Sequence, residues 1–245
     1  MAAAQSGNFI PNMEVLSQYV VNREGWEGIR QSLYDYMLYP AAGLSQASFF
    51  ALPQGQGTTV QGVGVAGATT KTLSDTNMTL AGQLPAQQNF LVQSIEVMFY
   101  PNVYHVTNAV GNPATRAVTS AATLAPSIVN DEYIFRKSGN LVFTIGSKAY
   151  LQEAPMGRFP PKTNYGVQGA FAGWSAATAP VDTMSVGALF PQSTGRPYML
   201  HPASLLLNSN QNFSITLNWP EGLQAITYPA KVGVVLDGFL YRRSQ

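Results

Sequence analysis

The side chains that most often do chemistry in proteins are scarce in this chain. Its 245 residues include two histidines, His105 and His201, and no cysteine. The absence of cysteine excludes disulfide-stapled modules and thiolate-bound zinc or iron–sulfur centres. Each histidine is alone in its segment, with no acidic residue within several positions, so a metal site would need a carboxylate brought to it by the fold. We therefore predict no metal and no cofactor.

The carboxylates offer no better starting point for catalysis. Among twelve acidic residues, only Asp131 and Glu132 are adjacent, whereas a glycoside hydrolase needs two carboxylates that flank one bond. Adjacent residues of a strand point to opposite faces, so this pair does not make a shared acid–base site on the strand expected there. The chain also lacks the G-x-S-x-G sequence that presents a serine nucleophile. We predict that the protein is not an enzyme.

One glycine-rich segment matches the dinucleotide-binding pattern by letter alone. Residues 62–67 read GVGVAG, but the pattern works only where a strand precedes it, a helix follows it and an acid lies about twenty residues further on. None of these features is present, so the segment is predicted to be a loop. A formal net charge of +1 without a long basic run gives no reason to expect sequence-specific nucleic-acid binding.

The scarcity of charge is the most informative property of the sequence. Asp, Glu, Lys and Arg make up 10% of the residues, against about 25% in ordinary globular chains. A folded monomer of this mass exposes roughly 10,000 Å², which leaves about one charge per 400 Å² of surface. A surface of Ala, Gly, Gln, Asn, Ser and Thr lacks the self-repulsion that keeps copies apart. We interpret it as a surface that neighbouring subunits cover.

The first forty residues are predicted to form a helical arm, residues 1–40. From 22 to 39 the apolar positions recur at spacings of three and four, which is typical of one face of a helix. Asn22 would cap this helix and Pro40 would end it. The apolar face could pack on the protein's own body, reach a neighbouring subunit or lie on a membrane surface. The candidate contact residues on it are Trp26, Ile29, Leu33, Tyr36 and Met37.

Residues 41–245 have the pattern of one β domain. Short apolar runs alternate with turns rich in Gly, Pro and Asn, and no convincing helix separates them, which favours an antiparallel sandwich or barrel. With its long loops, the chain is predicted to form an all-β, eight-stranded antiparallel jelly roll; a compact double jelly roll is the alternative. The eight strands are expected at 45–53, 90–100, 127–136, 141–151, 186–190, 197–207, 213–219 and 232–242, with lesser extended pieces at 104–110 and 166–171.

Two further groups of residues are candidates for contacts. The turn formed by Arg158, Phe159 and Pro160 belongs to a proline-containing segment that cannot join a central strand and suits a docking loop. Trp174 and Tyr165 would act as stacking platforms if the sandwich binds carbohydrate.

Several short segments of the sequence are similar to segments of viral shell proteins. They are VVLDGFLYR at 234–242, GQLP at 82–85 leading to FLV at 90–92, and IGSKAYL at 145–151. With the strand order and the uncharged loops, the chain resembles the jelly-roll capsid proteins of tailless icosahedral bacteriophages. The resemblance implies a barrel standing in a protein shell, often over an internal membrane, with subunits in trimers or pseudo-hexamers. The chain is shorter than the double-barrel members of this lineage.

The function expected from these observations is structural. We expect a capsid subunit that assembles with copies of itself and with other virion proteins into an icosahedral shell. The absence of cysteine and of an N-terminal secretory signal fits a virion assembled in the reducing host cytoplasm. The alternative is a carbohydrate-binding β-sandwich on a virion, as in a cement or receptor-binding protein.

Overall fold

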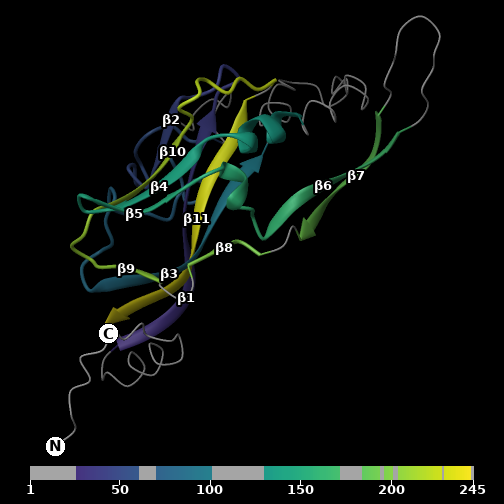
Figure 1. Ribbon diagram of the computed structural model, residues 1–245. Helices are drawn as coiled ribbons and strands as arrows, with labels where there is room; N and C mark the ends of the chain where they lie inside the picture. The colour runs from purple at the N-terminus through teal and green to yellow at the C-terminus, as the bar shows by residue number, and fades with distance from the viewer. Residues whose placement is uncertain are drawn as a thin grey trace, which may run out of the picture.

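The computed structural model describes residues 26–60, 70–100, 130–171, 184–193, 196–200, 204–227 and 229–243 (Figure 1). Within these ranges the chain is mostly β-structure, with one α-helix at 130–137 and one turn of 3-10 helix at Met156–Arg158. The all-β prediction is therefore confirmed. The strands are β1 (Trp26–Tyr39), β2 (Gln46–Phe49), β3 (Gln88–Tyr100), β4 (Asn140–Ile145), β5 (Lys148–Glu153), β6 (Thr163–Phe171), β7 (Met184–Ser193), β8 (Tyr198–Met199), β9 (Leu205–Leu207), β10 (Phe213–Asn218) and β11 (Ala230–Arg243).

The strands form two larger antiparallel sheets and one separate pair. Sheet A has the order β1-β11-β3-β8, and β9 also pairs with β3. Sheet B has the order β2-β10-β4-β5, and β6 pairs with β7. Neighbours within each sheet are mostly far apart in the sequence, so the chain crosses repeatedly between the sheets.

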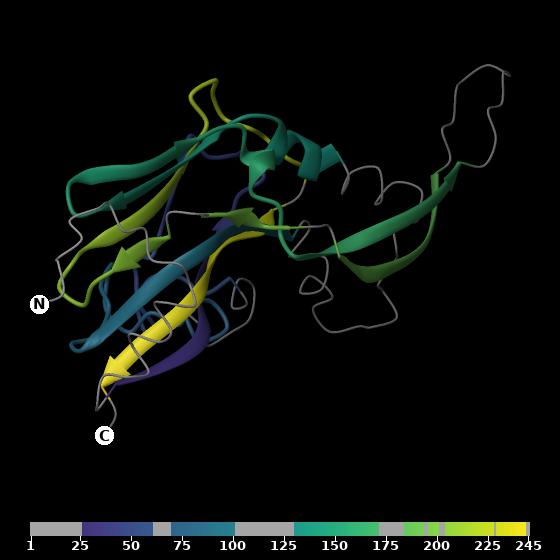
Figure 2. The same cartoon turned by 60° about the horizontal axis from the view of Figure 1, so that its bottom comes forward.

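One hydrophobic core joins the two sheets. Val97 and Val234 of sheet A and Phe143 and Ile215 of sheet B are all fully buried in the same cluster. In β10, buried residues alternate with half-exposed ones, as expected where one face of a sheet packs and the other meets solvent. The two sheets therefore pack as layers, which is visible in Figure 2.

The predicted helix from 22 to 39 is wrong over the described residues, because these residues form β1. Every residue of β1 pairs with β11, from Trp26 opposite Arg243 to Tyr39 opposite Ala230. The helical spacing arose because both faces of this strand carry large apolar or aromatic side chains, so its apolar positions do not follow a clean alternation. Residues 26–39 consequently belong to the sandwich rather than to a helical arm, and residues 1–25 lie outside the described ranges.

The predicted strand at 127–136 is also wrong, because residues 130–137 form the α-helix. Asp131 and Phe135, four residues apart, are fully buried on one side of it, and Arg136 pairs with Glu132 at 3.0 Å. Both spacings match the 3.6-residue period of a helix. The ring of Phe135 stacks on Phe99 at 4.6 Å, so the helix closes one end of the core.

Two other predicted strands are interrupted. The segment at 141–151 divides into β4 and β5 around Gly146, whose φ of +63° favours glycine in a tight turn. The segment at 197–207 divides into β8 and β9, and the histidine between them, His201, lies outside the described residues. The strands expected at 45–53, 90–100, 186–190, 213–219 and 232–242 correspond to β2, β3, β7, β10 and β11, and the lesser piece at 166–171 lies within β6. Residues 104–110 are not described.

The pair β6–β7 extends away from the two packed sheets, as Figures 1 and 2 show. Its register runs from Thr163 opposite Ser193 to Phe171 opposite Met184, with an irregularity between Gln168 and Gly169. Among the described strands, β6 and β7 form ladder pairs only with each other.

Candidate assembly surfaces

The contact candidates on β1 divide between the two faces of the strand. Leu33 is 4% exposed and lies in the core, Met37 packs against that core, and Ile29 is half-buried. Tyr36 is half-exposed on the opposite face of the strand, and the side chain of Trp26 lies outside the described residues. Tyr36 is thus the candidate on β1 that the structure places on the outer surface, whereas Leu33 is buried in the core of the same subunit.

The three contact candidates in the turn before β6 also differ in their exposure to solvent. Phe159 is fully buried in the core, where its ring lies 4.7 Å from that of Tyr198. Pro160 is half-buried, and Arg158 is exposed. Arg158 forms an ion pair with Glu153 of β5, so this turn joins sheet B to the edge of sheet A. Of the three candidates here, Arg158 is the one with an exposed side chain.

A cluster of tyrosines covers part of the outer face of sheet A. The ring of Tyr36 lies 5.9 Å from that of Tyr34 and 6.4 Å from that of Tyr100, and the ammonium of Lys231 lies 4.4 Å from its centre. Burial, together with neighbouring Tyr100, raises the pKa of Tyr36 well above its usual value. Its phenol is therefore neutral at physiological pH and contributes packing and a polar rim rather than charge.

Gly233 provides the space for this cluster. A Cβ atom at Gly233 would lie 2.1 Å from Cδ1 of Tyr36, which is far closer than two non-bonded carbon atoms can approach. The ring of Tyr36 therefore lies against the bare backbone of Gly233, the residue opposite it in β11.

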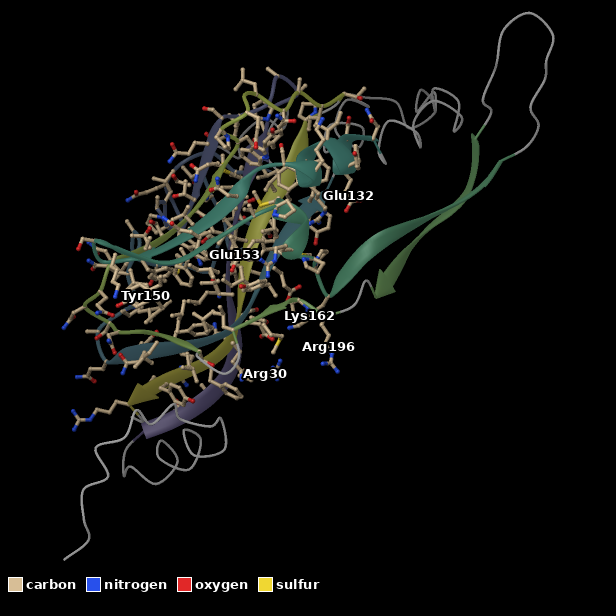
Figure 3. All side chains as sticks on the ribbon, in the orientation of Figure 1. Arg30, Glu132, Tyr150, Glu153, Lys162 and Arg196 are labelled. Atoms are coloured by element: carbon tan, nitrogen blue, oxygen red, sulfur yellow. The ribbon has the colours of Figure 1, made fainter. Side chains whose placement is uncertain are left out.

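A network of ions lies on the same outer face, beside the base of the β6–β7 pair. Lys162, the residue before β6, donates from its ammonium to Asp237 at 2.5 Å and lies 3.3 Å from Glu96. Its backbone N–H also donates to Glu96 at 2.7 Å, and Arg30 pairs with Asp237 at 2.8 Å. Figure 3 labels Lys162 and Arg30 on this side of the molecule. We call Glu96, Lys162, Asp237 and Arg30 the carboxylate clamp.

The electrostatics of the carboxylate clamp favour its charged state. Burial alone would raise the pKa of Asp237, but the hydrogen bond and charge of Lys162, with help from Arg30, outweigh it and lower this pKa. Burial would lower the pKa of Lys162, and Asp237 with Glu96 outweighs that effect and raises it. Both shifts have the same physical meaning: each ion is stabilised by its partner more than it is destabilised by leaving water.

The outer face of sheet B has a different character over three of its four strands, since the two charged residues of the sheet, Lys148 and Glu153, both belong to the edge strand β5. Strands β2, β4 and β10 contain no Asp, Glu, Lys or Arg. Asn218 donates to Asn140 across this face at 3.1 Å. The residues of these three strands that are exposed or half-exposed are Gln46, Ser48, Asn140, Val142, Thr144, Ser214, Thr216 and Asn218.

Two shallow depressions flank this neutral face. One, of about 380 Å³, is lined by residues of β4 and β5 and by Ala154, and Glu153 is the charged residue among them. The other, of about 220 Å³, is lined entirely by uncharged residues, among them Thr144 and Ser214. Among their described lining residues, neither depression combines a carboxylate with a hydroxyl or imidazole side chain.

A buried ion pair holds the loop between β2 and β3 against β1. Lys71 donates to Asp35 at 2.6 Å with both side chains nearly inaccessible to solvent, and Asp35 also accepts from the backbone N–H of Phe50 at 2.7 Å. Burial raises the pKa of Asp35, and the charge of Lys71 opposes this without cancelling it.

The same loop covers the free edge of β1. The side chain of Asn77 accepts from the N–H of Tyr34 at 3.0 Å and donates to the carbonyl of Ser32 at 2.8 Å. The N–H of Tyr36 donates to the carbonyl of Asp75 at 2.7 Å. An uncovered edge would invite pairing with any other strand, so the loop protects this part of the edge of β1.

Several residues considered for chemistry fall outside the described part of the chain: His105, His201, Trp174 and the glycine segment 62–67. Tyr165 lies in β6, and its side chain is likewise not described. Asp131 is described, and its carboxylate accepts from the N–H and hydroxyl of Thr227 at 2.8 and 2.9 Å. Asp131 therefore holds the loop at Thr227 in place.

Sequence reasoning missed the carboxylate clamp and the Asp35–Lys71 pair. The available signal was a single ion inside an apolar strand: Glu96 stands between Ile95 and Val97, and Asp237 follows Leu236. An ion in that position needs a partner from elsewhere in the fold. Which cation supplies it depends on strand register, which sequence spacing alone does not define.

The described residues contain no group of three or more acidic or imidazole side chains that could hold a metal ion. None of their helices has the length and apolar character needed to cross a membrane. Comparison with protein-family models, with curated proteins and with solved structures finds no match to this chain.

Proposed function

We propose that this protein is a structural subunit of a virion shell, with an eight-stranded jelly roll as its body. The order of strands supports the jelly roll. When β8 and β9 are taken as one interrupted strand and β6–β7 as an insertion, eight strands remain. Counted along the chain, the first strand pairs with the eighth, the second with the seventh, the third with the sixth and the fourth with the fifth. That is the pairing of a long hairpin rolled up into two Greek keys. All eight strands are used by one pair of sheets, which favours the single over the double jelly roll.

The neutral outer face of sheet B carries the proposal of self-assembly. Burial of a charged face would strip ions of water at a cost of several kcal/mol per unpaired ion. Hydroxyl and amide side chains need only exchange hydrogen bonds with water for hydrogen bonds across an interface, which is close to neutral in free energy. A face without ions is therefore inexpensive to cover and gives little repulsion between copies.

Assembly from such faces fits a shell of many weak contacts. A standard interface buries about 800 Å² on each partner, and repetition around closed symmetry turns modest individual contacts into a stable particle. The partners proposed are copies of this chain and other virion proteins, and the place of action is the virion.

The experiment that tests this proposal measures particle formation by the purified protein. Size-exclusion chromatography with light scattering, followed by negative-stain electron microscopy, should find closed or curved assemblies of the wild-type chain. Thr216→Lys places a charge at the centre of the neutral face and should weaken assembly at least tenfold in the concentration required. Thr58→Lys, the same change in an exposed loop, is the matched control and should assemble as the wild type does.

Circular dichroism and thermal melting establish that both variants remain folded. A wild-type protein that stays monomeric at high concentration would refute the proposal, and so would Thr216→Lys protein that assembles normally.

A further inference from the structure

Among the described residues, the β6–β7 pair has no neighbouring strand to support it. A two-stranded hairpin is marginally stable in water at best, and three or more strands or packing against another element are required for lasting order. In the described part of the chain, each strand of this pair forms ladder bonds with the other alone. Both outer edges of the pair therefore present backbone N–H and C=O groups that no described strand takes up.

The composition of the pair adds to this need. Neither β6, with the sequence TNYGVQGAF, nor β7, with the sequence MSVGALFPQS, contains a charged residue. Charged residues and prolines are the usual protection of exposed strands, and here Pro191 is the single such residue in the two strands. A neutral, partly apolar ribbon of this kind is expected to be covered in the working form of the protein.

The base of the pair is held so that the ribbon points away from its own sandwich. Lys162 is bound to Glu96 through both its backbone N–H and its ammonium, and to Asp237 through the ammonium alone. The adjoining Pro160 and Pro161 stiffen the connection. With this anchor, β6 and β7 leave the side of the molecule and do not fold back over sheet B (Figures 1 and 2).

We propose that the β6–β7 ribbon of one copy packs on the neutral outer face of sheet B of a second copy. This inference rests on the proposed self-assembly and identifies which surfaces meet. Sheet A is the poorer receiver, because Lys162 and Arg30 on its outer face are still partly exposed to solvent, and a ribbon without ions would remove their water without offering a new partner. Sheet B offers hydroxyl and amide groups, two shallow depressions and no ion on β2, β4 or β10.

The area that one ribbon can cover favours several repeated ribbon contacts between copies over one isolated contact. Nine residues at about 3.4 Å each give a ribbon about 30 Å long, and two strands spaced about 4.8 Å apart give a width near 10 Å. Its footprint of about 300 Å² is under half of a standard interface of about 800 Å² per partner. Each copy, however, donates one ribbon and receives another, so a ring of copies closes with two such contacts per subunit.

Single cysteines test this contact cleanly, because the natural chain has none. The donors are Ala188→Cys and Leu189→Cys in β7, since adjacent strand residues sample both faces of the ribbon. The receiver is Thr216→Cys in β10, and Arg30→Cys, exposed on the outer face of sheet A, is the control receiver. Donor and receiver proteins with tags of different mass are mixed under assembling conditions and then oxidised.

The expected result is a disulfide-linked heterodimer of one donor with Thr216→Cys, at least tenfold more abundant than with Arg30→Cys. Preferential cross-linking to Arg30→Cys, or donor–donor dimers that show ribbon packing on ribbon, would overturn the inference. Assembly of wild-type protein without any donor–receiver cross-link would also overturn it while leaving the proposed function intact. Failure of the wild type to assemble would instead count against the proposed function from which the inference starts.

Discussion

At the scale of single residues, the buried pair of Asp35 and Lys71 makes the sharpest prediction about stability. Lys71→Met leaves the Asp35 carboxylate buried without its cation, so we expect the free energy of unfolding at pH 7 to fall by about 3 kcal/mol or more. Lys148→Met, at an exposed site on β5, should change it by no more than about 0.5 kcal/mol. Urea denaturation of the two variants measures both effects.

The sign of the pH dependence distinguishes this mechanism from a simple packing loss. The pKa of Asp35 is already raised by burial, and removal of Lys71 should raise it further. A carboxyl group whose pKa is higher in the folded than in the unfolded protein destabilises the fold while it is ionised. This destabilisation disappears as the pH falls through the pKa of the folded state. The deficit of Lys71→Met should therefore shrink as the pH is lowered toward about 4. A deficit that is constant with pH would show that lost packing, and not the buried charge, is responsible.

Gly238 makes a second prediction at the same scale. It follows the register shift between Asp237 and Gly238 in β11, and a Cβ atom there would lie 1.9 Å from the carbonyl oxygen of Leu91 in β3. Because backbone cannot move aside as a flexible side chain does, Gly238→Ala should destabilise the protein by about 3 kcal/mol. Gly157→Ala, where the nearest atom is 3.6 Å away, is the control and should be nearly neutral. Equal melting temperatures for the two variants would contradict this account.

At the scale of elements, the carboxylate clamp ties the orientation of the β6–β7 ribbon to sheet A. The pKa of Asp237 is lowered in the folded state, so its ionised form stabilises the fold above its unfolded pKa of about 3.9, and that stability is lost as pH falls through the lower folded value. Asp237→Asn should therefore reduce stability at pH 7 and flatten the acid limb of the stability curve. Thermal melting between pH 2 and pH 7 measures it; a variant with the wild-type acid limb would exclude this role for Asp237.

The elements also show how far sequence patterns reach. Strands β3 and β11 were predictable as runs of mostly apolar residues, and β10 as an alternation of apolar and polar residues, each bounded by turn residues. Strand β1 was not, because Leu33 meets the core while Tyr36 meets the tyrosine cluster over Gly233, and an element covered on both faces loses the alternation that identifies a strand. The helix at 130–137 was mistaken for a strand because it is short. Its apolar contact with the core is made by Phe135, which stacks on Phe99, and one such residue is too few to show a helical period in the sequence. The neutral surface was predictable from composition, but its location on sheet B depends on which strands pair.

At the scale of the whole molecule, the distribution of charge predicts how assembly responds to salt. The ions of the described structure are largely paired with each other: Arg30 and Lys162 with Asp237, Arg158 with Glu153, and Lys71 with Asp35. The faces proposed to meet carry no ions in β2, β4, β6, β7 or β10. Screening by salt acts on charges and leaves contacts between neutral groups nearly unchanged.

The concentration of protein required for assembly should therefore change by less than about threefold between 50 mM and 500 mM sodium chloride. Light scattering as a function of protein concentration at the two salt levels measures this directly. Thr216→Lys provides the internal comparison, since repulsion between introduced charges is screened and salt should partly restore its assembly. If salt dissolved the wild-type assemblies instead, contacts between ions would hold the copies together, and the neutral face of sheet B would not be the surface through which they meet.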